Sequence, residues 1–503
     1  MKRRDFLRTS GLAFAGAVLL PQMMCVQLSS QKEDLPNMLA HFNVSENDLR
    51  KVMSVALEKG GEYADFYFQH SFSNTLVLQD GAVNRAASNI DYGVGIRVVS
   101  GDRQGYAFVE NITLEEMIKA AKVASRIANG AAKVPPVKTD EKMFKNYYPI
   151  LNSHEEQSIQ EKMPYLQKLN DKLFALDSRV VKVNAMINDE TSYILYYNSD
   201  GLLCHDVRPM VMISGSCVMQ QGDRIENGGA SRAARKDASF LTDDLVEEVV
   251  KEAFNKTNIM FEAVKPKGGE IPVVMSAGGS GILLHEAIGH AFEADFNRKN
   301  TSIFSDKLGK LICDKNISVV DDGTIEYDRG SINFDDEGIE SQRTYIVKEG
   351  ALTSYLHDRI SAKFYGIEPT GNGRRQSFRH IPIPRMRSTF MENGNCTEAD
   401  IISSVKNGIF VDTFTNGQVQ IGAGDFTFFV KTGYLIENGK LTKPIKDINI
   451  IGNGPKALAD ITMVANNLAI DQSTWTCGKD GQGCPVSQGL PSVLVKQLTV
   501  GGV

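Results

Sequence analysis

The stretch GGSGILLHEAIGH, residues 278–290, leads from a glycine turn into a helix that carries two histidines and a glutamate. A β-rich run, residues 271–276, precedes it, and mostly short strands separated by Gly, Asn and Asp turns follow it. Neutral imidazole nitrogens are the commonest protein ligands for zinc. A glutamate directly after the first histidine can take a proton from metal-bound water without binding the metal itself. The stretch therefore predicts a hydrolytic metal site, formed by His285, Glu286 and His290, inside a β-rich half of the chain.

The spacing of the two histidines is unusual for such a site. The common zinc-peptidase pattern H-E-x-x-H separates its histidines by four positions, about 40° apart around an ideal helix. Here five positions separate His285 from His290, which corresponds to about 140° and would turn the rings apart. Both rings can reach one metal if the turn is widened, as in a π-bulge, or if the helix ends near His290. Gly289 would tolerate such a distortion. The alternative is an ordinary helix with two unrelated histidines.

A catalytic zinc site usually has a third protein ligand, and the residues leave two choices open. Glu293 lies three positions after His290. Cys477 lies in a tight glycine-rich turn, residues 476–482, where Lys479 would favour the thiolate that binds metal. A disulfide between Cys477 and Cys484 is the alternative use of that cysteine.

A second cluster of candidate site residues lies in the run GNGRRQSFRHIPIPRM, residues 371–386. It concentrates arginines and one histidine among turns, and such a cluster can bind a peptide carboxylate or stabilise an oxyanion. His380 and Arg385 are therefore candidate catalytic residues. The alternative is a solvated loop with structural prolines.

The composition is that of an ordinary globular protein, with 42% hydrophobic and 23% charged residues among 503. The formal net charge of -6 and the absence of any RNA- or DNA-binding signature argue against nucleic-acid binding. No Lys-Ser/Thr pair follows the glycine turn, which argues against a nucleotide site. The length favours two domains plus a short leader. With KPKGG, residues 265–269, as the boundary, we expect a leader over residues 1–30 and domains over 31–265 and 266–503.

The N-terminal domain is expected to mix helices with antiparallel strands, which gives an α+β fold for the whole chain. Residues 45–48 form a capping box that opens a helix through Leu57, and Thr113 caps a second helix. Strands are expected at 64–69, 75–78, 94–99 and 105–109, with turns at 80–81, 101–102 and 198–201. Further helices are expected over 155–176, 243–254 and 456–464. The last of these belongs to the β-rich C-terminal domain that carries the metal-site helix.

The first residues match a twin-arginine export signal, which implies a periplasmic location. Lys2 and the string RRDFL, residues 3–7, precede an apolar run over residues 11–20. That run is well short of the ~20 residues that a spanning helix needs, so no transmembrane segment is expected. The residues before Cys25 lack the small side chains of a lipoprotein site, so no lipid anchor is expected there. The seven cysteines are too scattered for a disulfide scaffold.

Taken together, these motifs resemble the TldD/PmbA family, and specifically its TldD branch. The matching strings run in family order through residues 270–503: HEAIGH, FEADFNRKNTSIFSDKLG, VVDDGT, DDEGIESQ, PTGNGRR, PIPRM, GYLIENGK, IGNGPKAL and CGKDGQGCPVSQGLP. The N-terminal half is compatible with the family but less distinctive. The resemblance is highly specific because many independent strings agree.

This resemblance implies a zinc-dependent peptidase in which His285, His290 and Cys477 bind Zn²⁺ and Glu286 is the general base. It favours Cys477 over Glu293 as the third ligand. PmbA-type relatives lack the H-E-x-x-x-H pattern, so the intact motif indicates the catalytic branch. The family also implies a PmbA-like partner subunit that helps to enclose the site in a chamber for extended peptides. Familiar members are cytoplasmic, so the leader is a departure that makes a second copy of this chain the alternative partner.

The sequence therefore predicts an exported metallopeptidase that hydrolyses unfolded or extended peptides. His380 or Arg385 would help the metal to polarise the peptide carbonyl. Substrates are expected to add as a strand along an exposed edge in the β-rich half. Two alternatives stay open: a non-catalytic peptide-binding subunit with a structural metal, and a metal-dependent amidase that acts on cell-wall fragments.

Overall fold

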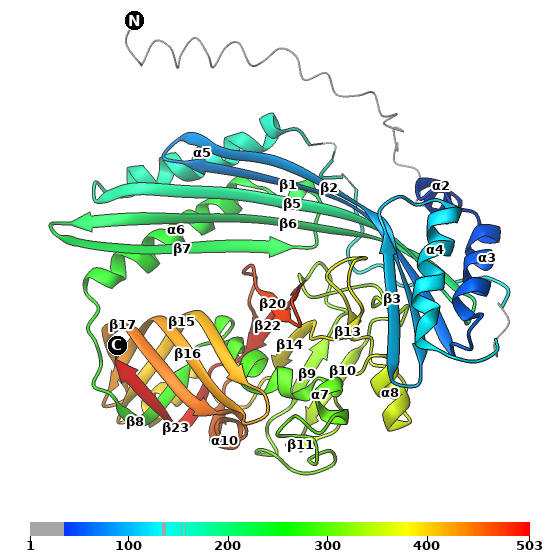
Figure 1. Cartoon of the computed structure of the whole chain (residues 1–503). Coiled ribbons are helices and arrows are strands. Elements are labelled where there is room, and N and C mark those ends of the chain that lie inside the picture. The colour runs from blue at the N-terminus through cyan, green and yellow to red at the C-terminus, as the bar shows by residue number, and fades with distance from the viewer. Residues whose placement is uncertain (1–34, 133–136, 152, 156, 503) are drawn as a thin grey trace, which may run out of the picture. The chain divides into compact units, whose positions relative to one another are not determined.

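Long antiparallel strands dominate the N-terminal half of the computed structural model, which describes residues 35–132, 137–151, 153–155 and 157–502 (Figure 1). The expected leader and Cys25 lie outside these residues. The strands are β1 (Tyr63–Gln79), β2 (Ala82–Ser100), β3 (Arg103–Val109), β4 (Asp140–Glu141), β5 (Val180–Asn198), β6 (Leu202–Gln221) and β7 (Arg224–Ala234). Their order is β3-β2-β1-β5-β6-β4, and β7 also pairs with β6. Every pairing is antiparallel except that of β4 with β6.

Local signals in the sequence explain where these elements begin and turn. Asp80 and Gly81 both have positive φ, as a tight two-residue turn between β1 and β2 requires. In α3 (Glu46–Leu57), Ser45 and Asp48 form the predicted capping box. The hydroxyl of Thr113 caps α4 (Leu114–Ala124) as predicted.

The helices cover the sheet in two groups. The helices α2 (Leu35–His41), α3 and α4 share one hydrophobic core with β1, β2 and β5. The helices α5 (Ile159–Leu176) and α6 (Asp243–Asn258) share another with β1, β5 and β6, and run along the long strands in Figure 1. No helix of the described residues is both long and apolar enough to cross a membrane.

Several expected elements differ from the structure, among them the strand expected at 94–99, which is the end of the longer β2. The strands expected at 64–69 and 75–78 are one strand, β1, because the polar residues between them pair with β2 and β5 on either side. The helix expected from residue 155 begins at Ile159, where Ser158 and Glu161 form a capping box. The helix expected over 456–464 is the short α10 (Gly454–Ala459), and the chain continues as a strand.

The C-terminal half contains a closed ring of strands beside a second sheet. The first sheet comprises β8 (Gly269–Met275), β15 (Asn407–Gln420), β16 (Asp425–Glu437), β17 (Lys440–Asn453), β18 (Ile461–Val464) and β23 (Val493–Gly502). Its order is β17-β16-β15-β8-β23-β18, and β17 also pairs with β23, so five of the strands close on themselves. The second sheet has the order β11-β10-β9-β14-β22-β19. Its strands are β9 (Val319–Asp322), β10 (Arg343–Lys348), β11 (Ala351–Leu352), β14 (Ser388–Met391), β19 (Ala469–Ile470) and β22 (Ser487–Leu490).

Short helices and two small hairpins complete this half. The helices are α7 (Ala294–Arg298), α8 (Arg359–Tyr365), α9 (Glu398–Ser404) and α10, and the hairpins are β12–β13 (Gly373–Arg374 and Ile383–Pro384) and β20–β21 (Thr476–Lys479 and Gln482–Pro485). The HEAIGH segment lies in the main hydrophobic core of this half, between strands of both sheets. The α+β prediction, with a β-rich C-terminal part that carries this segment, is confirmed.

Candidate metal centre

The HEAIGH segment forms a π-helix, η5 (Leu283–Gly289). The backbone N–H of His290 donates to the carbonyl oxygen of His285, five positions earlier, which is a widened turn. The two imidazole centroids lie 5.0 Å apart, with the ring planes at 82°. The predicted widening is therefore confirmed, and it lets two histidines five positions apart share one side of the turn.

Gly289 is needed for this turn because no side chain fits at its position. A Cβ there would overlap the sulfur of Met386 and lie 2.8 Å from the carbonyl oxygen of Leu284. Gly454, at the start of α10, fills a similar position, since a Cβ there would overlap the carbonyl oxygen of Ala287. The widened turn is thus packed closely on two sides by other parts of the chain.

Cys477 on β20 provides the third donor. The β20–β21 hairpin turns at Asp480 and Gly481, both with positive φ. The Sγ of Cys477 lies 3.4 Å from Nε2 of His290. One donor atom from each of His285, His290 and Cys477 lies within 4.8 Å of the other two, and all three residues are buried. The structure therefore brings together the residues that the sequence singled out as ligands, and metal binding itself stays a prediction.

Electrostatics favour the thiolate form of Cys477. Burial alone would raise the pKa of this thiol, but His285 and His290 hold it well below its ordinary value. The pKa of His290 is subject to opposite effects: burial lowers it, whereas Glu293 and Cys477 raise it well above its ordinary value. Deprotonated sulfur beside two imidazoles is a donor set that zinc favours.

The donor set fits zinc in number, type and burial. Within the described residues, these three form the one group of His, Cys, Asp or Glu side chains placed to hold an ion. The Nδ1 of His285 is buried and has no hydrogen-bond partner among the described residues. Two histidines and one cysteine leave one tetrahedral position for water or substrate, as catalytic zinc sites do.

Glu293, the other candidate for the third ligand, instead contacts His290. It is fully buried, and its Oε2 lies 2.9 Å from Nδ1 of His290 and 3.1 Å from Nζ of Lys479. Burial would raise the pKa of Glu293, but Lys479 and His290 bring it to about 2. An ionised carboxylate in this position orients the imidazole, as commonly happens behind metal-binding histidines. The sequence was interpreted only as offering Glu293 for a ligand role, although the three-position spacing from His290 could have indicated this contact.

The expected effect of Lys479 on the Cys477 thiol requires a correction. The ammonium of Lys479 lies 2.7 Å from Oδ1 of Asp295, 3.0 Å from the carbonyl oxygen of Pro384 and 3.1 Å from Oε2 of Glu293. Its positive charge is therefore directed at two carboxylates. The imidazoles, rather than Lys479, lower the pKa of the thiol.

Glu286 lies on η5 between the two histidines and is half-buried. Its Cγ lies 3.1 Å from the position that a Cβ would occupy at Gly417, so β15 runs directly beside it. The structure thus places this carboxylate on the same turn as His285 and His290. Its role as a base stays a prediction.

The structure gives His380 and Arg385 different surroundings from those expected. The Nδ1 of half-buried His380 lies 3.1 Å from Oγ of Ser377, and no hydrogen bond of the described residues joins it to η5 or Cys477. The buried Arg385 donates to the carbonyl oxygen of Cys477 and, at 3.3 Å, to that of Gln482. Arg385 therefore holds the hairpin that carries Cys477, and catalytic roles for both residues stay predictions.

The alternative disulfide is absent from the structure. Cys477 and Cys484 lie directly opposite each other in the β20–β21 hairpin, and both are free cysteines. The Sγ of Cys484 lies 3.4 Å from Nη1 of Arg385. Both sulfurs thus have polar partners of their own.

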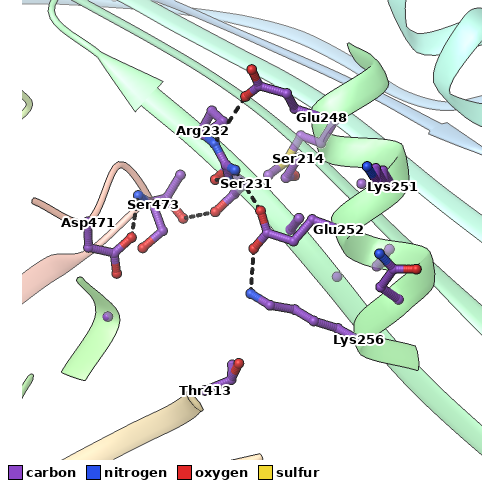
Figure 2. Close-up of a pocket in the computed structure, with 18 of the residues that line it drawn as sticks. Ser214, Ser231, Arg232, Glu248, Lys251, Glu252, Lys256, Thr413, Asp471 and Ser473 are labelled. Carbon is purple, nitrogen blue, oxygen red and sulfur yellow. Dashed lines mark hydrogen bonds and ion pairs between the residues drawn. The ribbon is translucent and has the colours of Figure 1, made fainter. Parts of the chain in front are cut away.

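A groove with a volume of about 1030 Å³ is lined in part by residues that are close in sequence to these segments (Figure 2). Gly279, just before η5, and Trp475, two residues before Cys477, both line it. Phe414, also in its lining, precedes Gly417 on the same strand, β15. The lining therefore includes sequence neighbours of all three segments, whereas His285, Glu286, His290 and Cys477 themselves are not part of it.

The opposite wall of the groove comes from the N-terminal half. Figure 2 shows Arg232 of β7 paired with Glu248 and Glu252 of α6, facing Asp471 and Ser473 of the C-terminal half. Charges of both signs line the groove, so it does not select strongly for one sign of charge.

Two curated relatives are metalloproteases by name. The chain is 37% identical over 473 residues to the metalloprotease TldD homolog of Haemophilus influenzae, which covers 92% of this chain and 98% of that protein. It is 27% identical over 456 residues to the zinc metalloprotease TldD homolog of Saccharolobus solfataricus, with coverage of 90% and 99%.

Solved structures share the fold. The crystal structure of a protein from Thermotoga maritima superposes with a TM-score of 0.74 at 22% identity, and the match covers 91% of this chain and 100% of that protein. TldE from Thermococcus kodakarensis superposes with a TM-score of 0.72 at 19% identity, with coverage of 90% and 100%. At these identities the likeness establishes the fold alone.

The domains of one family match the chain in order. Residues 64–128 match the PmbA/TldA metallopeptidase domain 1, residues 152–261 match the central domain, and residues 268–502 match the C-terminal domain. The resemblance to the TldD/PmbA family is thereby confirmed, and the prediction of a metallopeptidase is confirmed at the level of the family. This chain belongs to the PmbA/TldA metallopeptidase family.

Proposed function

We propose that this chain is a zinc-dependent peptidase that hydrolyses unfolded or extended peptides after export to the periplasm. The observation that carries the proposal is the gathering of His285, His290 and Cys477, buried and within 4.8 Å of one another, on a widened turn that also bears Glu286. A relative named as a zinc metalloprotease supports zinc as the metal.

His285, His290 and Cys477 would hold the ion. When bound, zinc lowers the pKa of a coordinated water towards ~7 and polarises a carbonyl oxygen. Glu286 accepts the proton of the attacking water and then donates it to the leaving amine. Arg385 keeps the Cys477 strand in place through its backbone carbonyl, and β15 beside Glu286 limits the carboxylate to one side of the turn.

Substrates would enter through the groove as extended chains. In the β-rich half, where strand addition was expected, five strands close into a ring, and the open edges of the second sheet, β11 and β19, do not line the groove. Residues 229–232 of β7, which pairs with β6 on one side, line the groove in the N-terminal half. Hydrogen bonds to this backbone would give affinity with little dependence on the peptide's side chains.

Export and assembly complete the proposal. The RRDFL string and the apolar run after it support the twin-arginine route, which exports folded proteins and therefore suits a metal inserted beforehand. The fold shared with TldE supports a PmbA-like partner subunit, and a second copy of this chain is the alternative. Light scattering of the purified chain alone would separate these, because only self-association gives a dimer mass.

The test of the mechanism is Glu286→Gln. The amide keeps the size of the side chain but cannot accept a proton, so turnover of an unfolded peptide should fall at least ~100-fold. Zinc content, measured by elemental analysis, should stay at the wild-type level because Glu286 is not among the three ligands. The exposed Glu326 provides the control Glu326→Gln, which should change neither quantity.

The same assay distinguishes the alternatives. Unchanged turnover in Glu286→Gln would rule out this glutamate as the base. A wild-type protein that binds zinc and peptides without cleaving them would be a non-catalytic subunit. Cleavage of cell-wall amides in preference to peptides would identify an amidase.

A further inference from the structure

Two pairs of side chains connect β20 to the segment that contains His290. Cys477 and Lys479 are two positions apart on β20, so both point to the same face of the strand. His290 and Glu293 are three positions apart, across a single 3-10 turn. Cys477 Sγ lies 3.4 Å from Nε2 of His290, and Lys479 Nζ lies 3.1 Å from Oε2 of Glu293. The second pair therefore joins the same two segments as the first pair.

The position of the Glu293 carboxylate is fixed by its burial and by its charged partners. Its side chain is 0% exposed, and the side chain of Lys479 is 4% exposed. An ionised carboxylate this deeply buried requires charged or hydrogen-bonding partners, and Glu293 has two, Lys479 and Nδ1 of His290. Lys479 also neutralises the neighbouring Asp295 at 2.7 Å, so its loss would leave two carboxylates facing each other.

The contact between Glu293 and His290 determines which imidazole nitrogen is free. In the neutral ring that a metal requires, an Nδ1–H that donates to Oε2 of Glu293 at 2.9 Å leaves the lone pair on Nε2. Nε2 is the nitrogen that lies 3.4 Å from the sulfur of Cys477. The contact with Glu293 thus favours, in a neutral ring, the tautomer that can share an ion with that sulfur.

We propose that Glu293 and Lys479 are positioning residues of the metal centre: Glu293 fixes the orientation and tautomer of His290, and Lys479 fixes Glu293 and the strand that carries Cys477. This inference rests on the proposed function, because it assumes that His290 and Cys477 share a zinc ion. It adds that zinc binding also requires Glu293 and Lys479. These two residues form a buried ionic pair that positions the ligands without touching the metal.

The experiment measures zinc affinity in the full chain, by competition with a chromophoric chelator, for wild type, Glu293→Gln and Lys479→Met. Carboxylates behind ligand histidines typically contribute 10- to 100-fold in affinity, so both variants should bind zinc about 10- to 100-fold more weakly. Cobalt-substituted protein adds a spectroscopic readout, since the sulfur-to-cobalt absorption band should shift or weaken in both variants.

Lys162→Met is the matched control. Lys162 is also a buried lysine, 4% exposed and 2.7 Å from Oδ2 of Asp189, but it lies on α5, in a core separate from that of η5. Its loss should lower the thermal unfolding temperature without changing zinc affinity or the cobalt spectrum. If Lys479→Met does not fold, Glu293→Gln carries the test alone, because the amide preserves the size of the side chain.

The outcomes separate the two proposals. Wild-type zinc affinity and an unchanged cobalt spectrum in folded Glu293→Gln would overturn the positioning role and leave the proposed function intact. A wild-type protein that binds no zinc would overturn the proposed function and, with it, this inference. Weaker binding in both variants, with normal binding in Lys162→Met, would support the positioning role.

Discussion

The absence of a side chain at Gly289, a glycine, permits the widened turn of η5. The carbonyl oxygen of Leu284 and the sulfur of Met386 occupy the space that a Cβ would need. The carbonyl belongs to the backbone of the turn itself, so it cannot move without changing the positions of His285 and His290. The spacing of the HEAIGH motif and the small residue before its last histidine therefore depend on each other.

We expect Gly289→Ala to weaken both the fold and the metal centre. Overpacking of a buried site costs about 1–3 kcal/mol, so the thermal unfolding temperature should fall by several degrees and zinc affinity should fall with it. Gly130→Ala is the control, because the nearest atom to a Cβ there lies 4.0 Å away. Wild-type values of both quantities in Gly289→Ala would contradict the close packing described here.

At the scale of elements, the candidate metal centre forms where the segment of η5 and His290 packs against the β20–β21 hairpin. The sequence could predict η5 and its distortion, because the histidine spacing and Gly289 are local features. It could not select the third ligand from chemistry alone, since Glu293 and Cys477 were equal candidates until the family resemblance was considered. The sulfur of Cys477 meets His290 across 187 positions of sequence, and no local pattern encodes such a contact.

The strands likewise separate features that local sequence predicts from features that depend on distant parts of the chain. Turns at Asp80–Gly81 and the caps at Ser45 and Thr113 were predictable, because the residues that form them are neighbours in sequence. The continuity of β1 through its polar middle was not, because β2 and β5 satisfy that backbone from both sides. Likewise, the contacts of Arg385 depend on the docked hairpin.

We expect Arg385→Gln to act on the hairpin rather than on the substrate. The guanidinium donates to the carbonyl oxygens of Cys477 and Gln482, and a shorter amide cannot reach both. Zinc affinity should therefore fall about 10-fold, as for other residues that support metal ligands. If Arg385 acts on the peptide carbonyl instead, kcat would fall while zinc affinity in the chelator assay stays at the wild-type value.

At the scale of the whole described molecule, a buried ionic network joins the N-terminal sheet to the C-terminal half. Nε of Arg97, on β2, lies 2.9 Å from Oδ2 of Asp65. Nη1 of the same side chain lies 2.7 Å from Oε1 of Glu337. All three side chains are 0% exposed. Burial acts to lower the pKa of Arg97, but Asp65 and Glu337 raise it well above its ordinary value. The DDEGIESQ string that contains Glu337 is thus partly a structural connection between the halves.

We expect Arg97→Met to be strongly destabilising. It would leave Asp65 and Glu337 buried and without their shared cation, and removal of one partner from a buried pair costs about 3–5 kcal/mol. Thermal unfolding followed by circular dichroism should show a lower transition temperature, and the two halves should no longer unfold together. The exposed Arg103 supplies the control Arg103→Met. A transition within one degree of wild type would show that the network contributes little.

The distance in sequence between the donors has a consequence for biosynthesis. A ribosome makes His285 and His290 well before it makes Cys477, 187 positions after His290. A growing chain that already exposes two imidazoles still lacks the sulfur, so it can hold an ion only weakly until the β20–β21 hairpin has emerged and docked. Under the proposed function, metal capture would be delayed until the C-terminal half is nearly complete, and a truncated translation product would not compete for the ion.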